Sequence, residues 1–230
     1  VDDMLKGIKL DIPDKTTMTP NGALFRTDKQ GFLPKMMQEL YDERVIYKKK
    51  MLSAQQEYED TKDKKYLKLI SRYNNIQMAR KISLNSAYGA IGNQWFRYYD
   101  KAIAEGITKS GQLSIRWIEN KLNKYLNNIL KTNDDYVIAS DTDSVYLTMD
   151  KLVTQTIKSD NALSKTINFL DKVASESIEP YITKSYDELK QYTNAFANKM
   201  FMKREVIADK GIWVAKKRYI LNVWNSEGVS

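Results

Sequence analysis

Two aspartates stand between two apolar, β-branched runs in the stretch "YVIASDTDSVYL", residues 136–147. The two runs predict short strands joined by a tight turn. Asp141 and Asp143 are two residues apart, and residues i and i+2 of an extended chain point to the same face. A tight hairpin therefore directs both carboxylates at one spot, where they suit Mg²⁺. Two such ions about 4 Å apart stabilise both the attacking and the leaving oxygen of a phosphoryl transfer.

The composition narrows this chemistry further. Among the 230 residues there is no histidine and no cysteine. This excludes zinc sites built from these residues, Ser-His triads and thiolate catalysis, so a bound metal must be a hard cation held by oxygen. The alternative for "DTDS" is an ordinary polar turn, because Asp, Thr and Ser are all favoured in turns.

The net charge indicates the kind of partner. A formal charge of +8 favours a polyanion, with nucleic acid ahead of an anionic membrane surface. The alternative is a lysine-rich surface that only contacts water. No run of 18 apolar residues occurs, so the sequence predicts no membrane span.

Long helices must position these residues. Residues 35–88 contain no Gly and no Pro, which predicts two helices packed as an antiparallel hairpin around a charged break at 59–65. A third helix is expected over 101–130, where Gly106 and Gly111 would allow close packing against a sheet.

The remaining elements predict an α+β fold. Residues 161–192 have a helical pattern that Pro180 interrupts. After them, "MFMKREVIA", "DKG" and "IWVAKKRYILNVW" predict a β-hairpin whose turn is "DKG", residues 209–211. Strands and long helices without regular βαβ spacing favour an antiparallel sheet flanked by helices.

A second polar set lies in the predicted hairpin of helices. Lys81, Asn85 and Tyr88 are spaced i, i+4 and i+7, so they share one helix face. The lysine can hold a phosphate, the tyrosine can pack against a base or a sugar, and Gly89 leaves room for a base pair. The alternative is a solvated polar face.

The two patterns together resemble a known family. "K-x-x-x-N-S-x-Y-G", followed about fifty residues later by "D-T-D-S", resembles motifs B and C of family B DNA polymerases. "GNQWFRYYD" and "AKKRYILNVW" bring the match close to the replicative polymerases of T-even-like bacteriophages. The resemblance runs from "PNGALF" to "NVW" and implies addition of deoxynucleotides to a primer 3′-OH, in the cytoplasm of a bacterial host.

The resemblance also implies residue roles. The motif C aspartates would be catalytic and would bind two Mg²⁺ ions, with Glu205 as a further palm carboxylate at the metal site. The nucleotide-binding residues would be Arg44, Lys48, Lys81, Asn85 and Tyr88. The residues that hold primer–template DNA would be Lys216, Lys217, Arg218 and Tyr219.

The cations of the last group are expected to contact an anion. Three cations on one strand are costly to bury, so they face solvent or phosphate. Strand alternation would put Lys216 and Arg218 on one face, and Lys217 and Tyr219 on the other. The alternative is a solubilising edge strand.

The resemblance implies three regions and one missing part. Residues 1–34 would lead into the palm, 35–95 would form the fingers hairpin, and 96–230 would form the palm with the "DTDS" hairpin and the "KKRY" strand. No segment matches the family's motif A, "D-x-x-S-L-Y-P", which supplies another metal-binding aspartate. We therefore expect this chain to need the remaining polymerase segments, which are motif A, the exonuclease and the thumb.

Three other interpretations stay open at this point. One is a DNA-binding module, and another is a split-polymerase subunit without catalysis of its own. Intact "DTDS" and "KxxxNSxYG" patterns argue against a pure binder. The third is a reverse transcriptase or RNA polymerase palm, although the fingers pattern fits family B better. Metal dependence and sugar preference would separate these interpretations.

Overall fold

A computed structural model describes residues 1–157 and 163–226 of the chain. The fold is α+β, mostly helical with small antiparallel sheets. The chain divides into two compact units. We call Phe25–Ile107 the helical unit, and Val1–Leu24 together with Thr108–Ser230 the mixed unit. Among the described residues, no helix is both long and apolar enough to cross a membrane.

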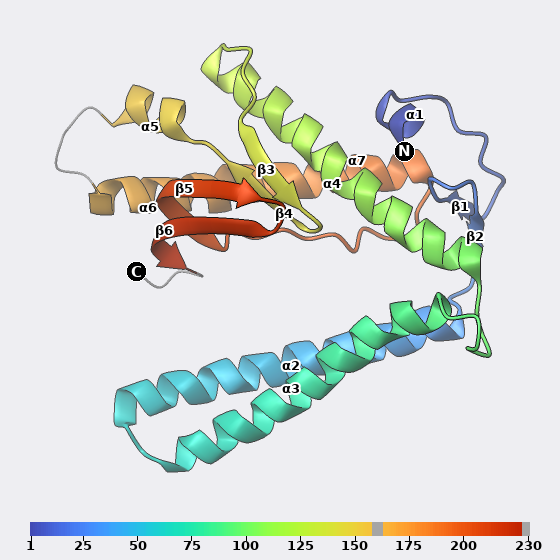
Figure 1. Cartoon of the computed structure of the whole chain (residues 1–230), viewed down its shortest axis with the longest axis horizontal. Coiled ribbons are helices and arrows are strands. Elements are labelled where there is room, and N and C mark those ends of the chain that lie inside the picture. The colour runs from blue at the N-terminus through green and yellow to red at the C-terminus, as the bar shows by residue number, and fades with distance from the viewer. Residues whose placement is uncertain (158–162, 227–230) are drawn as a thin grey trace. The chain divides into compact units, whose positions relative to one another are not determined.

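The helical unit is built on a pair of antiparallel helices, α2 (Phe32–Thr61) and α3 (Lys65–Ile91) (Figure 1). The predicted hairpin and its charged break are therefore confirmed. Helix α2 begins at Phe32 instead of residue 35, because Pro34 fits the first turn, where its missing N–H costs nothing. It ends at Thr61, and the left-handed φ of 53° at the next residue, Lys62, turns the chain toward α3.

Helices α2 and α3 pack against each other extensively. The Nε of Arg80 lies 2.5 Å from a carboxylate oxygen of Glu43, and the rings of Tyr47 and Tyr73 lie 6.2 Å apart. Ala54 of α2 is buried, whereas most charged side chains on both helices are exposed. The exposed surface of the hairpin thus combines charged side chains with apolar ones such as Ile46 and Ile82.

The core of the mixed unit lies between two helices. Helix α4 (Lys101–Leu130) has the predicted bounds, and it buries Ile118 and Leu122 against Tyr186 of α7 (Glu179–Thr193). A Cβ added at Gly111 would meet nothing within 4 Å. The close packing expected at Gly111 is therefore absent, and this glycine only lowers helix propensity.

The predicted helix at 161–192 is divided. Helix α6 (Leu163–Val173) runs into a π-helical segment, η1 (Ala174–Ile178), which continues into α7. Pro180 lies in the first turn of α7, and the widened turn before it accommodates the proline, which has no N–H to donate. Residues 161 and 162 of the prediction lie outside the described residues.

Three pairs of short strands complete the part of the chain that the structure describes. The smaller elements are α1 (Asp2–Leu5), β1 (Thr16–Met18), β2 (Leu24–Arg26), β3 (Val137–Asp141), β4 (Ser144–Leu147) and α5 (Asp150–Thr156). The longer hairpin is β5 (Val206–Ala215) with β6 (Arg218–Ser226). Both β3–β4 and β5–β6 are antiparallel, as predicted.

The predicted turn of the β5–β6 hairpin is wrong. Residues 209–211 lie inside β5, and the chain reverses at Lys216 and Lys217, the latter with a φ of 62°. Gly211 serves packing instead, because a Cβ there would lie 2.7 Å from the indole of Trp213. The predicted alternation of the "KKRY" residues along one strand is therefore also wrong: two form the turn, and Arg218 and Tyr219 open β6.

Candidate functional site

The aspartates lie on the turn that joins β3 and β4. Asp141 pairs with Ser144, so Thr142 and Asp143 form the turn itself. The N–H of Asp143 donates to the carbonyl of Asp141 at 2.6 Å, and the Ser144 hydroxyl donates to the same oxygen at 3.1 Å. Thr142 has a φ of 52°, which makes the reversal tight. Asp141 therefore ends β3 and Asp143, which is exposed, lies in the turn itself, so the tight turn predicted between the two strands is confirmed.

The surroundings of Asp141 favour its ionised form. The Thr142 hydroxyl donates to the Asp141 carboxylate at 2.9 Å, and Lys217 Nζ lies 3.4 Å from the same oxygen. These contacts, first the Thr142 hydrogen bond and then the charges of Lys217 and Lys216, lower the pKa of Asp141 against an opposing desolvation. The carboxylate is 36% exposed, so it remains open to a ligand in the anionic form that a cation requires.

An aromatic cluster joins the aspartate hairpin to the lysine turn. The Tyr146 ring of β4 lies 5.5 Å from Trp213 of β5 and 5.4 Å from Tyr219 of β6, edge-on to each. Burial is the main cause that raises the pKa of Tyr146. The cluster packs the two hairpins together, and Lys217 consequently reaches Asp141. The structure thus brings two predicted groups together, the "DTDS" aspartates and the "KKRY" cations.

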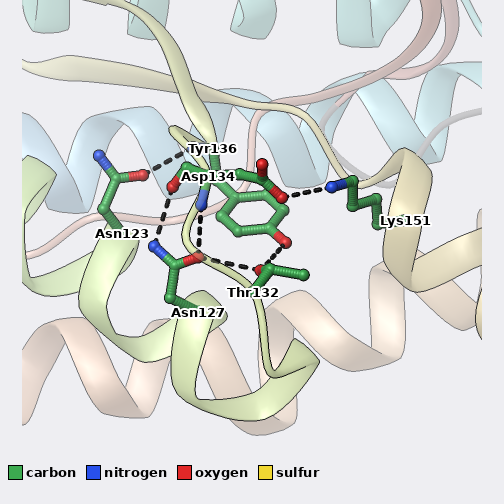
Figure 2. Close-up of polar contacts among 6 residues, drawn as sticks. All are labelled: Asn123, Asn127, Thr132, Asp134, Tyr136 and Lys151. Atoms are coloured by element: carbon green, nitrogen blue, oxygen red, sulfur yellow. Dashed lines mark hydrogen bonds and ion pairs between the residues drawn. The ribbon is translucent and has the colours of Figure 1, made fainter.

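A polar network fastens the start of β3 to α4 (Figure 2). The Asn123 side-chain oxygen accepts the N–H of Tyr136 at 2.7 Å, and Asn127 accepts the N–H of Asp134 at 2.8 Å. The Thr132 and Tyr136 hydroxyls lie 2.6 Å apart. Sequence reasoning missed this network, although two asparagines spaced i, i+4 just before a polar loop were a signal for it.

The predicted nucleotide-binding residues all lie in the helical unit. Lys81, Asn85 and Tyr88 are exposed on α3, and Lys48 is exposed on α2. Arg44 of α2 is partly buried, and its Nε has no hydrogen-bond partner within the described part of the chain. The Glu43–Arg80 ion pair sets α2 and α3 in register at this level of the hairpin.

Glu205 does not complete a three-carboxylate site. It is exposed and directly precedes β5. Within residues 1–157 and 163–226, no group of three acidic, histidine or cysteine side chains is placed to hold a metal ion. The structure therefore brings Asp141 and Asp143 together on one turn without a third carboxylate beside them.

Comparisons with known proteins decide the family. The sequence model for DNA polymerase family B matches residues 3–178. The DNA-directed DNA polymerase of Escherichia phage RB69 is 34% identical over 266 residues, covering 94% of this chain. The chain belongs to DNA polymerase family B. The enzyme of Enterobacteria phage T4 is likewise 34% identical over 268 residues, covering 93% of the chain, so the predicted likeness to T-even phage polymerases is confirmed.

This family B chain is much shorter than its relatives. It spans 30% of the length of each of the two phage polymerases. A more distant match is DNA polymerase beta of African swine fever virus, 29% identical over 158 residues, which covers 66% of this chain and 12% of that protein. The family match includes Lys81 and the aspartate turn but ends before Glu205 and Lys217.

Proposed function

We propose that this chain supplies the fingers and central palm of a DNA-directed DNA polymerase that adds deoxynucleotides to a primer 3′-OH. The observation that carries the proposal is the tight β3–β4 turn, which places Asp141 at the end of β3 and Asp143 in the turn two residues later. Residues 35–95 would form the fingers, which agrees with the α2–α3 hairpin, and 96–230 the palm, with 1–34 leading into it.

The turn fits part of a divalent metal site. Members of this family generally use divalent metal ions. The donors here are accessible carboxylate oxygens, which Mg²⁺ and Mn²⁺ prefer. Asp141 and Asp143 would hold the ions together with ligands from the remaining polymerase segments, because the described residues offer no third carboxylate at the turn. When bound, the pair of ions would stabilise the attacking and leaving oxygens of the phosphoryl transfer.

The side chains of the fingers would bind the incoming nucleotide. Lys81 and Lys48 are exposed cations suited to a triphosphate. The Nε of partly buried Arg44 has no hydrogen-bond acceptor among the described residues, and a phosphate oxygen would provide one. Asn85 and Tyr88 follow Lys81 along the same face of α3, where the tyrosine ring would pack on the nascent base pair.

The β5–β6 turn would hold the primer–template. Lys216 and Lys217 project from a hairpin tip, and Lys217 is 64% exposed, which suits phosphate contacts that do not depend on sequence. Arg218 and Tyr219 follow at the start of β6. Because Lys217 lies beside Asp141, the residues that hold the duplex would place the primer end next to the carboxylates.

A second candidate is a DNA-binding subunit without catalysis of its own. The lack of a third carboxylate among the described residues favours it. The two candidates differ in one result. If the chain is part of the enzyme, mixing it with the motif A segment should give Mg²⁺-dependent primer extension. If it is only a DNA-binding subunit, the mixture should bind DNA without extending the primer.

The test is single-turnover primer extension by the assembled polymerase that carries Asp143→Asn. We expect incorporation to fall by at least about a thousandfold while duplex affinity stays within a few-fold, because a metal ligand is removed. Asp150→Asn is the matched control, an exposed aspartate at the start of α5. Near-wild-type extension by Asp143→Asn would contradict the proposal.

A further inference from the structure

The carboxylate turn stands on a strand that contains an irregularity. Val137 pairs with Leu147, but Ala139 pairs with Tyr146, so Ile138 is an extra residue in β3. Such a bulge locally disrupts the ladder. A one-residue slip of a strand moves every side chain to the opposite face. Asp141, four residues beyond Val137, would be displaced by such a slip.

One side chain holds β3 just before the bulge. The Asn123 oxygen accepts two consecutive backbone N–H groups, from Tyr136 at 2.7 Å and from Val137 at 3.2 Å. Its amide nitrogen donates to the carboxylate of Asp135 at 2.8 Å, and that same oxygen accepts the Val137 N–H at 3.1 Å. Only the amide oxygen can accept an N–H, so these hydrogen bonds fix the orientation of the side chain.

The residues beside Asn123 on α4, and the residues whose N–H groups it accepts, are buried. Leu122 and Leu126 flank Asn123 on α4 and are 1% and 2% exposed, and Tyr136 and Val137 are 2% and 7% exposed. Removing the acceptor would leave the N–H of buried Tyr136 without its partner, which is costly, and would leave the Val137 N–H with only Asp135 as acceptor. The carbonyl of Tyr136 is held as well, because it accepts the N–H of Thr148 at 2.9 Å.

We propose that Asn123 is a positioning residue for the aspartate turn. It fixes β3 ahead of the bulge, so that the hairpin holds a single register and presents Asp141 and Asp143 together. The inference rests on the proposed function, since the turn matters as a metal site. Asn123 itself touches neither substrate nor metal.

Two variants and one control separate this role from general stability. Asn123→Ala removes both hydrogen bonds to the strand. The exchange Asn123→Asp with Asp135→Asn keeps an acceptor for the strand and leaves the net charge unchanged. Asn127→Ala is the control, one helical turn further along α4. It removes comparable hydrogen bonds, to Asp134 and Thr132, but none to β3.

Two readouts on the purified chain test the proposal. The first is hydrogen exchange over residues 138–146, expected to be about tenfold faster in Asn123→Ala and near wild-type in the exchange variant and in Asn127→Ala. The second is Mn²⁺ line broadening of the 141–144 amides. Its midpoint should rise about tenfold in Asn123→Ala alone, as expected when a ligand loses its orienting partner.

The outcomes are distinct. Unchanged exchange and Mn²⁺ response in a folded Asn123→Ala chain would overturn the inference, as would equal effects in Asn127→Ala. If Asn123→Ala does not fold by circular dichroism, Asn123→Gln, which shifts the acceptor by one methylene, takes its place under the same criteria. Absence of Mn²⁺ broadening in the wild type would contradict the proposed metal site, while the exchange result would still decide the role of Asn123.

Discussion

Gly211 offers a sharp test of how the two hairpins pack. A Cβ at this position would lie 2.7 Å from two carbons of the Trp213 indole and 2.8 Å from a methyl of Leu221. Ordinary contacts begin at 3.4 Å, so Gly211→Ala must push the indole away by roughly 0.7 Å. The indole cannot move freely, because Tyr146 and Tyr219 pack against it.

Overpacking of this kind costs about 1–3 kcal/mol. For a chain of this size, that corresponds to a melting temperature lowered by about 2–12 °C in differential scanning calorimetry. The displaced ring would also disturb the ion pair between Lys217 and Asp141, since the same cluster joins the two hairpins.

Gly111→Ala is the matched control with the opposite sign. Gly111 is exposed in the interior of α4, and an added Cβ meets nothing within 4 Å. Alanine is favoured over glycine there by about 1 kcal/mol, so the melting temperature should rise by about 2–4 °C. A Gly211→Ala chain as stable as the wild type would refute the packing described for Trp213.

Four further predictions follow from the site. Lys81→Ala should lower the affinity for the incoming deoxynucleotide by about 10–100-fold in a pre-steady-state titration, since one charge-assisted hydrogen bond is removed, and should leave primer–template affinity unchanged. An unchanged nucleotide affinity would mean that Lys81 only contacts solvent. Replacing Lys216, Lys217 and Arg218 by alanine should reduce the slope of log duplex affinity against log salt concentration by about one for each phosphate that these cations neutralise. Equal slopes for this variant and the wild type would mean that the turn does not contact DNA. Thr142→Val should raise the pKa of Asp141, because the largest cause that lowers it is removed, and an NMR titration of the carboxyl group measures the change. Because the folded-state pKa of Asp141 is depressed, its stabilisation is lost as pH falls through that pKa, and Thr142→Val should weaken this loss; an unchanged titration midpoint would contradict the hydrogen bond. Finally, the purified chain should not extend a primer by itself, whereas robust extension that disappears in Asp143→Ala would show that a third carboxylate lies within it.

The long helices and the aspartate hairpin could be predicted because their signals are local. The run without glycine or proline at 35–88 and the helix predicted over 101–130 each extend over many turns, so the overall pattern outweighs single residues. The "DTDS" turn could be predicted from the β-branched runs on either side of it, which form β3 and β4. Nothing tests the predicted nucleotide and DNA contacts, which stay predictions.

The remaining features depend on tertiary packing. "DKG" has ordinary turn chemistry, but Gly211 is required beneath the Trp213 indole, and the turn falls at Lys217 in a conformation that lysine rarely adopts. Asn123 looks like one more polar residue on a helix, because its partners at Tyr136 and Val137 lie across a loop. Neither packing under a ring nor a bond across a loop has a periodic signature in sequence.

The central claim is that Asp141 and Asp143 bind a divalent metal, and Fe²⁺-directed backbone cleavage tests it most directly. Fe²⁺ replaces Mg²⁺ on oxygen ligands, and with ascorbate and peroxide it produces hydroxyl radicals that cut the nearest peptide. We predict cleavage between Ser140 and Ser144, suppressed by excess Mg²⁺ and abolished in the Asp141→Asn, Asp143→Asn double variant. Cleavage that occurs elsewhere, or that persists in the double variant, would contradict the metal site on this turn.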